Sequence, residues 1–305
     1  MGEDKNGDGG RARTFRLFNT AVPARPLTPA LYLVATPIGN LGDITLRALE
    51  TLAGADLLAC EDTRVTRVLL DRYGIENRPF AYHEHNADEA GPRLLQALAE
   101  GRSVALVSDA GTPLVSDPGY RLALQAIEAG HRVVPIPGAS APLAALVGAG
   151  LPNDAFFFAG FLPAKDKGRR DRLAELAGVP ATLIFFESPH RIAATLVAAA
   201  DVLGGDRKAA VCRELTKTFE EFRRGTLAEL AGHYEEVDNV KGEIVLVIGP
   251  PGEKETPEAD IEAILADLSG TMPTAKAATE AARITGLPRK ELYQRLLDMK
   301  GRHGA

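Results

Sequence analysis

Between residues 30 and 250 the chain alternates between short apolar runs and longer amphipathic stretches, and this alternation constrains the fold most. The runs cover residues 31–35, 57–61, 104–109, 132–136, 156–160, 182–187, 209–214 and 243–249. Apolar residues recur with helical spacing between them, as in 46–53, 63–73, 89–100, 120–129, 170–177 and 191–203. Near-continuous apolar strands separated by helices are typical of βαβ units with mostly parallel sheets covered on both faces. The pattern therefore predicts an α/β fold.

Composition divides the chain into four segments. Residues 1–28 mix charged residues, glycine and proline without an apolar period or the apolar core of a secretory signal, which predicts a disordered tail. A glycine- and proline-containing string at 148–153 suggests a boundary between α/β domains at 29–150 and 151–252, the second with more antiparallel strands. A Pro/Glu/Lys-rich linker opens the last segment, 253–305, where helical patterns cover 259–268, 273–285 and 288–300.

Charge and cysteine content narrow the classes of function. Lys and Arg number 35 and Asp and Glu 41, so the net charge of −6 argues against a surface covered in phosphate-binding charge. Cys60 and Cys212 each lie in an apolar run, which indicates buried thiols in a reducing, cytoplasmic compartment rather than a disulfide scaffold. No apolar run reaches about 18 residues, so no membrane span is expected.

The last helical patterns are basic although the chain is acidic. Residues 275–302 contain seven basic and three acidic side chains. A basic helix-turn-helix fits a nucleic-acid contact. A small packed bundle with a solvated charged face fits the same pattern, so both interpretations stay open.

Glycine and proline are concentrated directly after three predicted strands, in residues 35–43, 108–119 and 135–142. Ligands of open α/β sheets bind outside the carboxyl ends of the strands, and these residue types let the backbone approach a ligand closely. Asp109, at a strand end, can accept hydrogen bonds from ribose hydroxyls or an amine. The patterns GxGxxG and GxxxxGK(S/T) are absent. The three segments favour a pocket for a nucleoside without a phosphate tail over ordinary βα turns.

Eight motifs in order carry a family resemblance. They are LVATPIGNLGDIT, EDTR, VSDAGTPLVSDPG, PIPGASA, FAGFLPAK, FFESPHRI, CRELTKTFEE and KGEIVLVI. Together they resemble the ribosomal RNA small subunit methyltransferase I family of the tetrapyrrole methylase superfamily. The resemblance covers residues 29–250, and the C-terminal helices look like that family's helix-turn-helix extension.

The resemblance implies a homodimeric enzyme that uses S-adenosylmethionine, bound between the two α/β domains. It implies methylation of the 2′-hydroxyl of one cytidine in 16S ribosomal RNA, within the small subunit. The cofactor contacts that it implies are Pro37, Ser108, Asp109, Ala110, Val115, Ser140, Ala141, Phe186 and Leu215.

Methyl transfer to a hydroxyl needs in-line alignment, a proton acceptor and stabilisation of the developing alkoxide, but no metal. For catalysis we expect Lys165 and Arg64 to hold phosphate or the alkoxide, and Glu187 and His85 to act as base. For RNA binding we expect Glu61, Asp62, Asn86, His190, Arg191, Arg289 and Lys290. Structural alternatives exist, since Asp62 can cap a helix beginning at Thr63 and Glu61 can pair with Arg64. The loop histidines His83 and His85 make a weak metal pattern, so we expect no metal site.

Two other functions use the same features. One keeps the fold and cofactor but methylates carbon in a tetrapyrrole. The other is a non-enzymatic nucleic-acid-binding module, which the net charge disfavours. The motif string favours the RNA methyltransferase.

Overall fold

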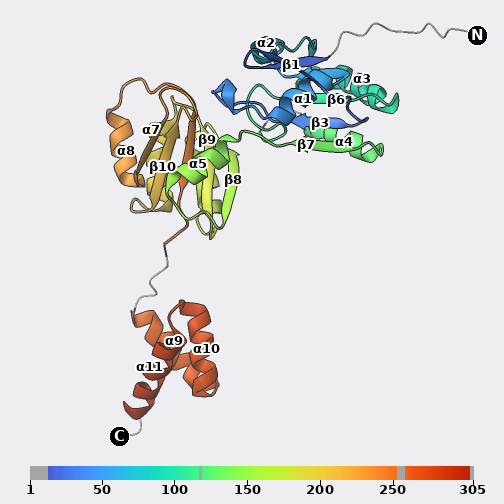
Figure 1. Ribbon diagram of the computed structural model, residues 1–305. Coiled ribbons are helices and arrows are strands. Elements are labelled where there is room, and N and C mark those ends of the chain that lie inside the picture. Colours follow the sequence, from blue (N-terminus) through green and yellow to red (C-terminus); the bar gives the residue numbers. More distant parts are fainter. Residues whose placement is uncertain (1–12, 117–118, 253–257, 303–305) are drawn as a thin grey trace, which may run out of the picture. The chain divides into compact units, whose positions relative to one another are not determined.

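A computed structural model of the chain describes residues 13–116, 119–252 and 258–302 (Figure 1). The chain forms two compact units, Met1–Pro250 and Pro251–Ala305. The first unit contains two five-stranded sheets and a two-stranded hairpin. The α/β fold predicted from the alternating pattern is therefore confirmed.

The first sheet is wholly parallel, with strand order β5-β4-β6-β3-β7. Its strands are β3 (Leu31–Val34), β4 (Leu57–Cys60), β5 (Pro79–Ala81), β6 (Val104–Val107) and β7 (Val133–Ile136). Its helices are α1 (Leu46–Gly54), α2 (Thr63–Arg72), α3 (Ala87–Ala99) and α4 (Tyr120–Glu128), with the 3₁₀ turn η1 at Leu41–Asp43. Alternate residues of the central strands enter two cores, one beneath α1 and α2 and the other beneath α3 and α4. Burial on both faces explains the nearly continuous apolar runs.

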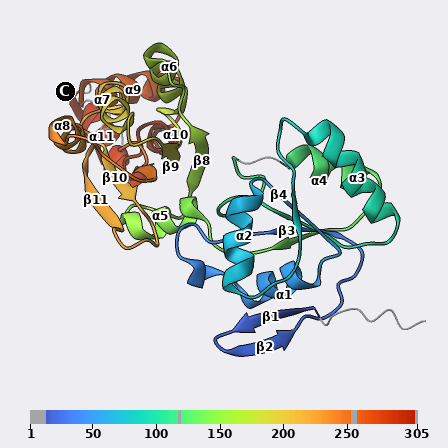
Figure 2. The same ribbon diagram turned by 90° about the horizontal axis from the view of Figure 1, so that it is seen from above.

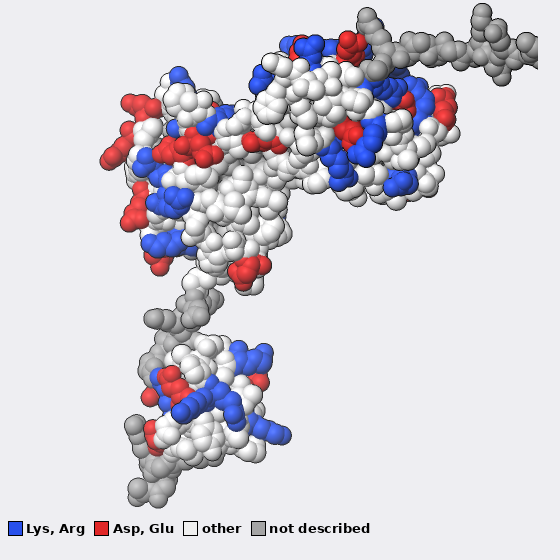
Figure 3. Space-filling model, in the orientation of Figure 1, with Lys and Arg blue, Asp and Glu red and all other residues white. Residues whose placement is uncertain are grey.

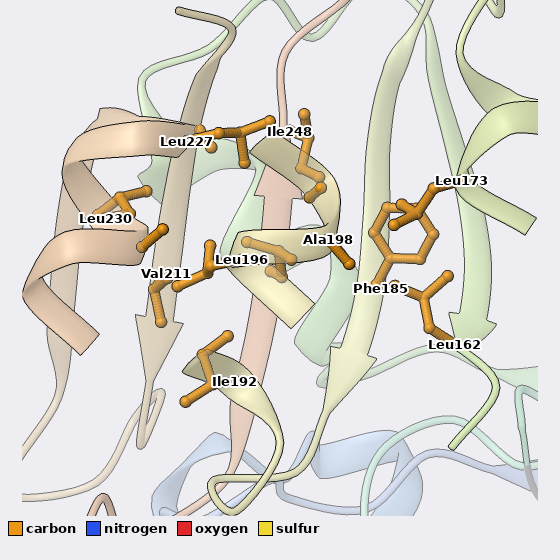
Figure 4. Close-up of a cluster of buried hydrophobic side chains, with 14 of the residues drawn as sticks. Leu162, Leu173, Phe185, Ile192, Leu196, Ala198, Val211, Leu227, Leu230 and Ile248 are labelled. Carbon is orange, nitrogen blue, oxygen red and sulfur yellow. The ribbon is translucent and has the colours of Figure 1, made fainter. Parts of the chain in front are cut away.

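The second sheet has the order β11-β10-β12-β9-β8 and is mostly antiparallel, as expected. Its strands are β8 (Phe156–Phe161), β9 (Thr182–Glu187), β10 (Lys208–Arg213), β11 (Glu221–Thr226) and β12 (Ile244–Ile248). One face packs against α6 (Asp166–Leu176), α7 (Ile192–Leu203) and α8 (Leu227–Glu236), and Figure 4 shows this core around Phe185 and Leu196. The other face packs against α5 (Ala141–Ala149).

Helix α5 packs against the second sheet, although its sequence follows the last strand of the first. Ala145, Leu146 and Ala149 are buried with Ile184 and Val247 of β9 and β12. The chain thus passes from one sheet to the other between β7 and α5, ahead of the expected boundary at 148–153. The glycines of that string end α5, with Gly150 in the left-handed region (φ +73°).

The disordered tail expected at 1–28 is wrong for residues 13–28, and residues 1–12 lie outside the described residues. Strands β1 (Thr14–Leu17) and β2 (Thr20–Pro23) form an antiparallel hairpin that packs beside α1 (Figure 2). Phe15 is only 4% exposed, and the N–H of Arg16 donates to the carbonyl of Tyr73 at 2.7 Å. Four-residue strands give almost no period, and their stability comes from tertiary packing that a local pattern does not reveal.

The second unit is a three-helix bundle with its own core. It consists of α9 (Glu258–Thr271), α10 (Thr274–Thr285) and α11 (Arg289–Arg302), close to the expected ranges. Leu265, Ala278, Leu292 and Leu296 are among its buried residues. Gly286, with φ +75°, ends α10. Among the described residues of both units, no helix is long and apolar enough to span a membrane.

Replacing Phe15 by alanine should lower the free energy of unfolding by about 3 kcal/mol, because losing a buried phenylalanine ring costs roughly 3–5 kcal/mol and this ring lies at the margin of the core. The matched control is Phe18→Ala in the same hairpin, where the side chain is fully exposed (102%). It should change stability by less than about 0.5 kcal/mol. Urea denaturation followed by circular dichroism measures both, and equal effects would contradict the assignment of the hairpin to the core.

Candidate functional site

A cavity of about 400 Å³ is lined by loops of the first sheet and by the ends of elements of the second. From the first sheet come Ile38, after β3, and the segment after β6 that includes Ala110, Gly111 and Val115. The N-terminus of α5 and the second sheet contribute Ser140, Ala141, Pro142, Phe161, Phe186, Glu187, Ser188, Pro189, Leu215, Gly242, Glu243, Ile244 and Val245. Its size lies in the range that encloses a small-molecule cofactor.

The charge of the lining limits what this cavity can bind. Among the described residues that line it there is no lysine, arginine or histidine, whereas Glu187 and Glu243 each carry a carboxylate. Phosphate-rich ligands are normally held by cationic side chains together with helix N-termini, and of these the described lining supplies the N-terminus of α5 but no cationic side chain. The lining therefore favours a neutral or cationic ligand over one rich in phosphate.

Backbone pairing fixes the first-sheet wall of the cavity. The N–H of Thr36 donates to the carbonyl of Gly111 at 2.8 Å, and the N–H of Gly111 returns a bond to Thr36 at 3.1 Å. Gly111 has φ +78°, and a Cβ at this position would lie 3.3 Å from Ile38 Cγ2. A larger residue here would be strained and would press on Ile38. The glycine-rich segments after β3 and β6 thus form one joined wall.

Glu187, an expected base, has a fully buried carboxylate that is already engaged. Its oxygens accept hydrogen bonds from the Ser188 N–H (2.7 Å) and the Thr195 hydroxyl (2.6 Å), and Arg191 forms an ion pair with it at 3.2 Å. Arg191 also donates to the carbonyl of Leu162 at 2.6 Å. Both residues therefore hold the loop 187–191 in shape, which favours positioning over proton transfer for Glu187 and over RNA contact for Arg191.

A second ionic cluster at the cavity was missed from the sequence. Lys217 Nζ lies 2.8 Å from Glu214 Oε1 and 3.1 Å from Glu243 Oε2. The Lys217 ammonium lowers the pKa of Glu214. Its aliphatic stem covers Gly39, where a Cβ would lie only 2.5 Å from Lys217 Cγ. The spacing of Glu214 and Lys217 within the motif CRELTKTFEE was the only signal in the sequence.

Six of the nine expected cofactor contacts line this cavity and three do not. Ala110, Val115, Ser140, Ala141, Phe186 and Leu215 line it. Pro37, Ser108 and Asp109 instead line a neighbouring cavity of about 250 Å³. Asp109 Oδ1 accepts a hydrogen bond from the Asp62 N–H at 2.8 Å, so the carboxylate ties together the loops after β4 and β6.

The EDTR segment has a structural role. Asp62 caps α2 by accepting the Arg64 N–H at 2.8 Å, which confirms the capping alternative. The Arg64 guanidinium pairs with Asp62 at 2.6 Å, and the hydrogen bond from Arg64 lowers the pKa of Asp62 to about 2. Arg64 thus pairs with Asp62, and the pairing of Glu61 with Arg64 stays a prediction.

The remaining expected site residues lie on the surface or in loop contacts. His85, Lys165 and His190 are exposed, and none of them lines the 400 Å³ cavity. Asn86 accepts the His83 N–H at 2.8 Å and donates to the carbonyl of Ala81, the last residue of β5, at 2.9 Å.

The two expected RNA contacts of the second unit lie at the start of α11. Arg289 and Lys290 are both exposed. Arg289 Nε donates to the Thr279 hydroxyl at 3.0 Å.

Comparison with known proteins identifies the class of fold. Residues 30–231 match the family model described as Tetrapyrrole (Corrin/Porphyrin) Methylases, and residues 255–300 match the RsmI C-terminal HTH domain. A solved cobalt precorrin-4 methyltransferase superposes with a TM-score of 0.56 at 17% identity, covering 72% of this chain and 94% of that one. A conserved hypothetical protein from Aeropyrum pernix K1 superposes with a TM-score of 0.58 at 18% identity, covering 91% and 98%. The class is thus that of the tetrapyrrole methylase fold.

Curated relatives narrow the class. A protein of Mesorhizobium japonicum named ribosomal RNA small subunit methyltransferase I is 66% identical over 285 residues, 93% of this chain and 97% of that one. The protein of the same name from Escherichia coli O157:H7 is 49% identical, covering 89% and 96%. The chain belongs to the ribosomal RNA small subunit methyltransferase I family, which confirms the resemblance.

Replacing Glu187 by glutamine should lower the free energy of unfolding by about 2 kcal/mol. Breaking a buried ion pair costs about 3–5 kcal/mol, and Arg191 is 27% exposed, so water compensates part of the loss. The control Glu175→Gln removes a pair with Arg172 whose side chains are 40% and 63% exposed, and should cost less than about 0.5 kcal/mol. Thermal unfolding measures the stability of both variants. Equal stabilities would contradict a structural role for the Glu187 carboxylate.

Proposed function

We propose that the chain transfers a methyl group from S-adenosylmethionine to the 2′-hydroxyl of a cytidine in 16S ribosomal RNA, acting on the small subunit in the cytoplasm. The observation that carries the donor assignment is the apolar cavity with two carboxylates and no cationic side chain among its described lining residues. Membership of the family supports a ribosomal RNA substrate.

The residues present fit this donor. Val115, Phe186 and Leu215 offer apolar surface to a nucleoside, and Ser140 offers a hydroxyl. Among the described residues the lining has no cationic side chain, so a sulfonium cation meets no like charge from a lining side chain. A uroporphyrin-III C-methyltransferase from Thermus thermophilus with the same fold (TM-score 0.51, 23% identity) was solved in complex with S-adenosylhomocysteine. When bound, S-adenosylmethionine supplies an activated methyl group.

The protein must align the acceptor oxygen and receive its proton. As a bond forms from the 2′-oxygen to the methyl carbon, the carbon–sulfur bond breaks and the hydroxyl proton leaves. Arg64, His85 and Lys165 follow the carboxyl ends of β4, β5 and β8 and are exposed to an incoming RNA. Within the proposal, His85 accepts the proton and Arg64 and Lys165 bind phosphate. Glu187 positions the cavity wall.

The tetrapyrrole alternative rests on the fold alone. The solved tetrapyrrole methyltransferases described above are below 25% identical, whereas relatives of 66% and 49% identity are named ribosomal RNA methyltransferases. No feature of the described residues favours the non-enzymatic alternative.

The proposal includes a homodimer. Large apolar side chains are exposed on α5 and on the edge strand β8, at Leu143 (49%), Val147 (74%), Phe156 (47%) and Phe157 (39%). Figure 3 shows the same face largely free of charged side chains. Contiguous apolar surface of this kind is typical of subunit interfaces, and sedimentation of the intact chain measures the assembly.

The substrate assignment predicts selective labelling. With radiolabelled S-adenosylmethionine, the protein should label small ribosomal subunits but neither naked 16S RNA nor a porphyrinogen. Nuclease digestion should recover the label on a 2′-O-methylcytidine. Label on the porphyrinogen would favour the tetrapyrrole alternative, and label on no acceptor would favour the non-enzymatic one.

The donor site predicts a charge-specific effect of Val115→Arg. A cation in the cavity should weaken binding of S-adenosylmethionine by at least about tenfold, because like charges near 4 Å repel by about 1–4 kcal/mol. Binding of the uncharged thioether S-adenosylhomocysteine should weaken less. Calorimetry measures both. Val237→Arg is the control, at similar exposure (37% against 39%) but outside the cavity. An equal loss for both ligands would indicate steric blockage instead.

The basic start of α11 predicts an RNA-specific defect. The double variant Arg289→Gln/Lys290→Gln should raise KM for small subunits by about threefold to tenfold, with a salt dependence shallower by about 0.7–0.9 per lost phosphate contact. Binding of S-adenosylmethionine should be unchanged. Arg283→Gln is the control, since Arg283 already pairs with Glu280 at 2.5 Å. A normal KM in the double variant would favour the packed-bundle interpretation.

A further inference from the structure

One aromatic side chain of the larger cavity stands at its opening. Phe161, the last residue of β8, is among the residues that line the 400 Å³ cavity, yet 59% of its surface is exposed. Val115 and Ser116, from the segment after β6, line the same cavity and are also exposed. Residues that line a cavity and are open to solvent lie where the cavity meets the surface. These three side chains therefore mark the mouth of the cavity.

A β-bulge turns Phe161 toward the cavity. Phe158 lies opposite Ile184 and Phe161 opposite Phe186, so β8 has one residue more than β9 over this stretch. Side chains three positions apart on a regular strand point to opposite faces, whereas one extra residue returns them to the same face. The rings of Phe158 and Phe161 accordingly both contact Phe186.

The ring of Phe161 is held by its neighbours. Its centroid lies 5.4 Å from that of Phe186, which in turn lies 5.0 Å from that of Phe158, and both pairs are steeply inclined, as aromatic pairs prefer. The next residue, Leu162, is only 2% exposed, and its carbonyl accepts a hydrogen bond from Arg191 at 2.6 Å. The ring is thus fixed in place while more than half of its surface stays open to a ligand.

The chemistry of the proposed reaction brings the acceptor to this mouth. The 2′-oxygen must contact the methyl carbon in line with the breaking carbon–sulfur bond, so the acceptor sugar has to enter the cavity that holds the donor. The base is attached to the sugar carbon next to the one that bears the 2′-hydroxyl, so it accompanies the reacting oxygen. Enzymes that act on nucleotides commonly turn the target out of its stack and hold the base against aromatic or apolar side chains.

We propose that Phe161 is the stacking surface for the base of the acceptor cytidine, at the mouth of the cavity that holds the donor. The inference rests on the proposed function and adds to it a residue that positions the acceptor. Lys165, which binds phosphate in that proposal, follows four residues later, so the segment between β8 and α6 supplies both contacts. Stacking tolerates any base, so Phe161 determines where the base lies rather than which base is accepted.

A kinetic test separates the flat ring from its apolar volume. Phe161→Leu keeps most of the volume but removes the ring, and should lower kcat/KM for small subunits by about tenfold, within the roughly fivefold to 150-fold that stacking of one base is worth. Phe161→Tyr keeps the ring and should stay within about twofold of wild type. Both variants should bind S-adenosylhomocysteine with a dissociation constant within about twofold of wild type. The control Phe18→Leu, at a fully exposed ring outside the cavity, should change neither quantity.

Four outcomes would overturn the proposal. Unaltered kcat/KM in Phe161→Leu, or an equal loss in Phe161→Tyr, would exclude stacking. Weaker binding of S-adenosylhomocysteine by Phe161→Leu would make the residue a donor contact. Dissociation of the assembly in sedimentation of Phe161→Leu would make it a contact with a second copy of the chain.

A second test does not depend on methyl transfer. The photo-crosslinking residue p-benzoylphenylalanine is placed at position 161 or, as control, at position 18, and the protein is irradiated with small ribosomal subunits. Crosslinks from position 161 alone are expected, at or next to the nucleotide of 16S RNA that the labelling assay identifies. Crosslinks only to protein, or equal yields from both positions, would overturn this inference alone. If wild-type protein labels no subunits in the methylation assay, the proposed function fails whatever the crosslinks show.

Discussion

The reciprocal backbone hydrogen bonds between Thr36 and Gly111 are the constraint on which the site depends. They join the segments that leave β3 and β6, two adjacent strands at the centre of the first sheet. In a parallel sheet these exits lie at the same edge, and short glycine-rich segments can run side by side there without side chains intervening. The residues of these segments divide between two cavities, with Ile38, Ala110 and Gly111 lining the larger one and Pro37, Gly39, Ser108 and Asp109 lining the smaller one.

The second sheet contributes the electrostatics of the site. Its charged groups near the larger cavity are carboxylates held by neighbours: Glu187 by Arg191 and Thr195, and Glu243 by Lys217. Arg191 and Lys217 are absent from the described residues that line the cavity, and the Glu187 carboxylate is fully buried against its own partners. The paired carboxylates therefore shape the wall, and among the described residues the lining presents no cationic side chain to a ligand.

The sequence predicts the fold where the strands are buried, because burial on both faces requires a continuous run of apolar residues. Strands β4 and β6, buried on both faces, gave unbroken apolar runs, and the basic helices of the C-terminal unit were visible from spacing. The sequence did not predict the hairpin around Phe15 or the packing of α5 against the second sheet, because both depend on tertiary contacts. The expected cofactor contacts in the loops after β3 and β6 could not be divided between two cavities by sequence, because residues only one or two positions apart line different cavities. Asp62 and Arg191 lie in loops at the expected edge of the sheets, but they bond to neighbouring protein groups, which the sequence alone did not establish.

The separate core of the C-terminal unit has a consequence for substrate capture. Within the proposed function, a bundle that buries Leu265 and Leu292 in a core of its own binds RNA in a separate equilibrium. Because it is covalently joined to the first unit, each binding event raises the effective concentration of the same RNA at the other unit. Two individually weak contacts can therefore yield firm retention of a ribosomal particle, while either one alone releases free RNA quickly.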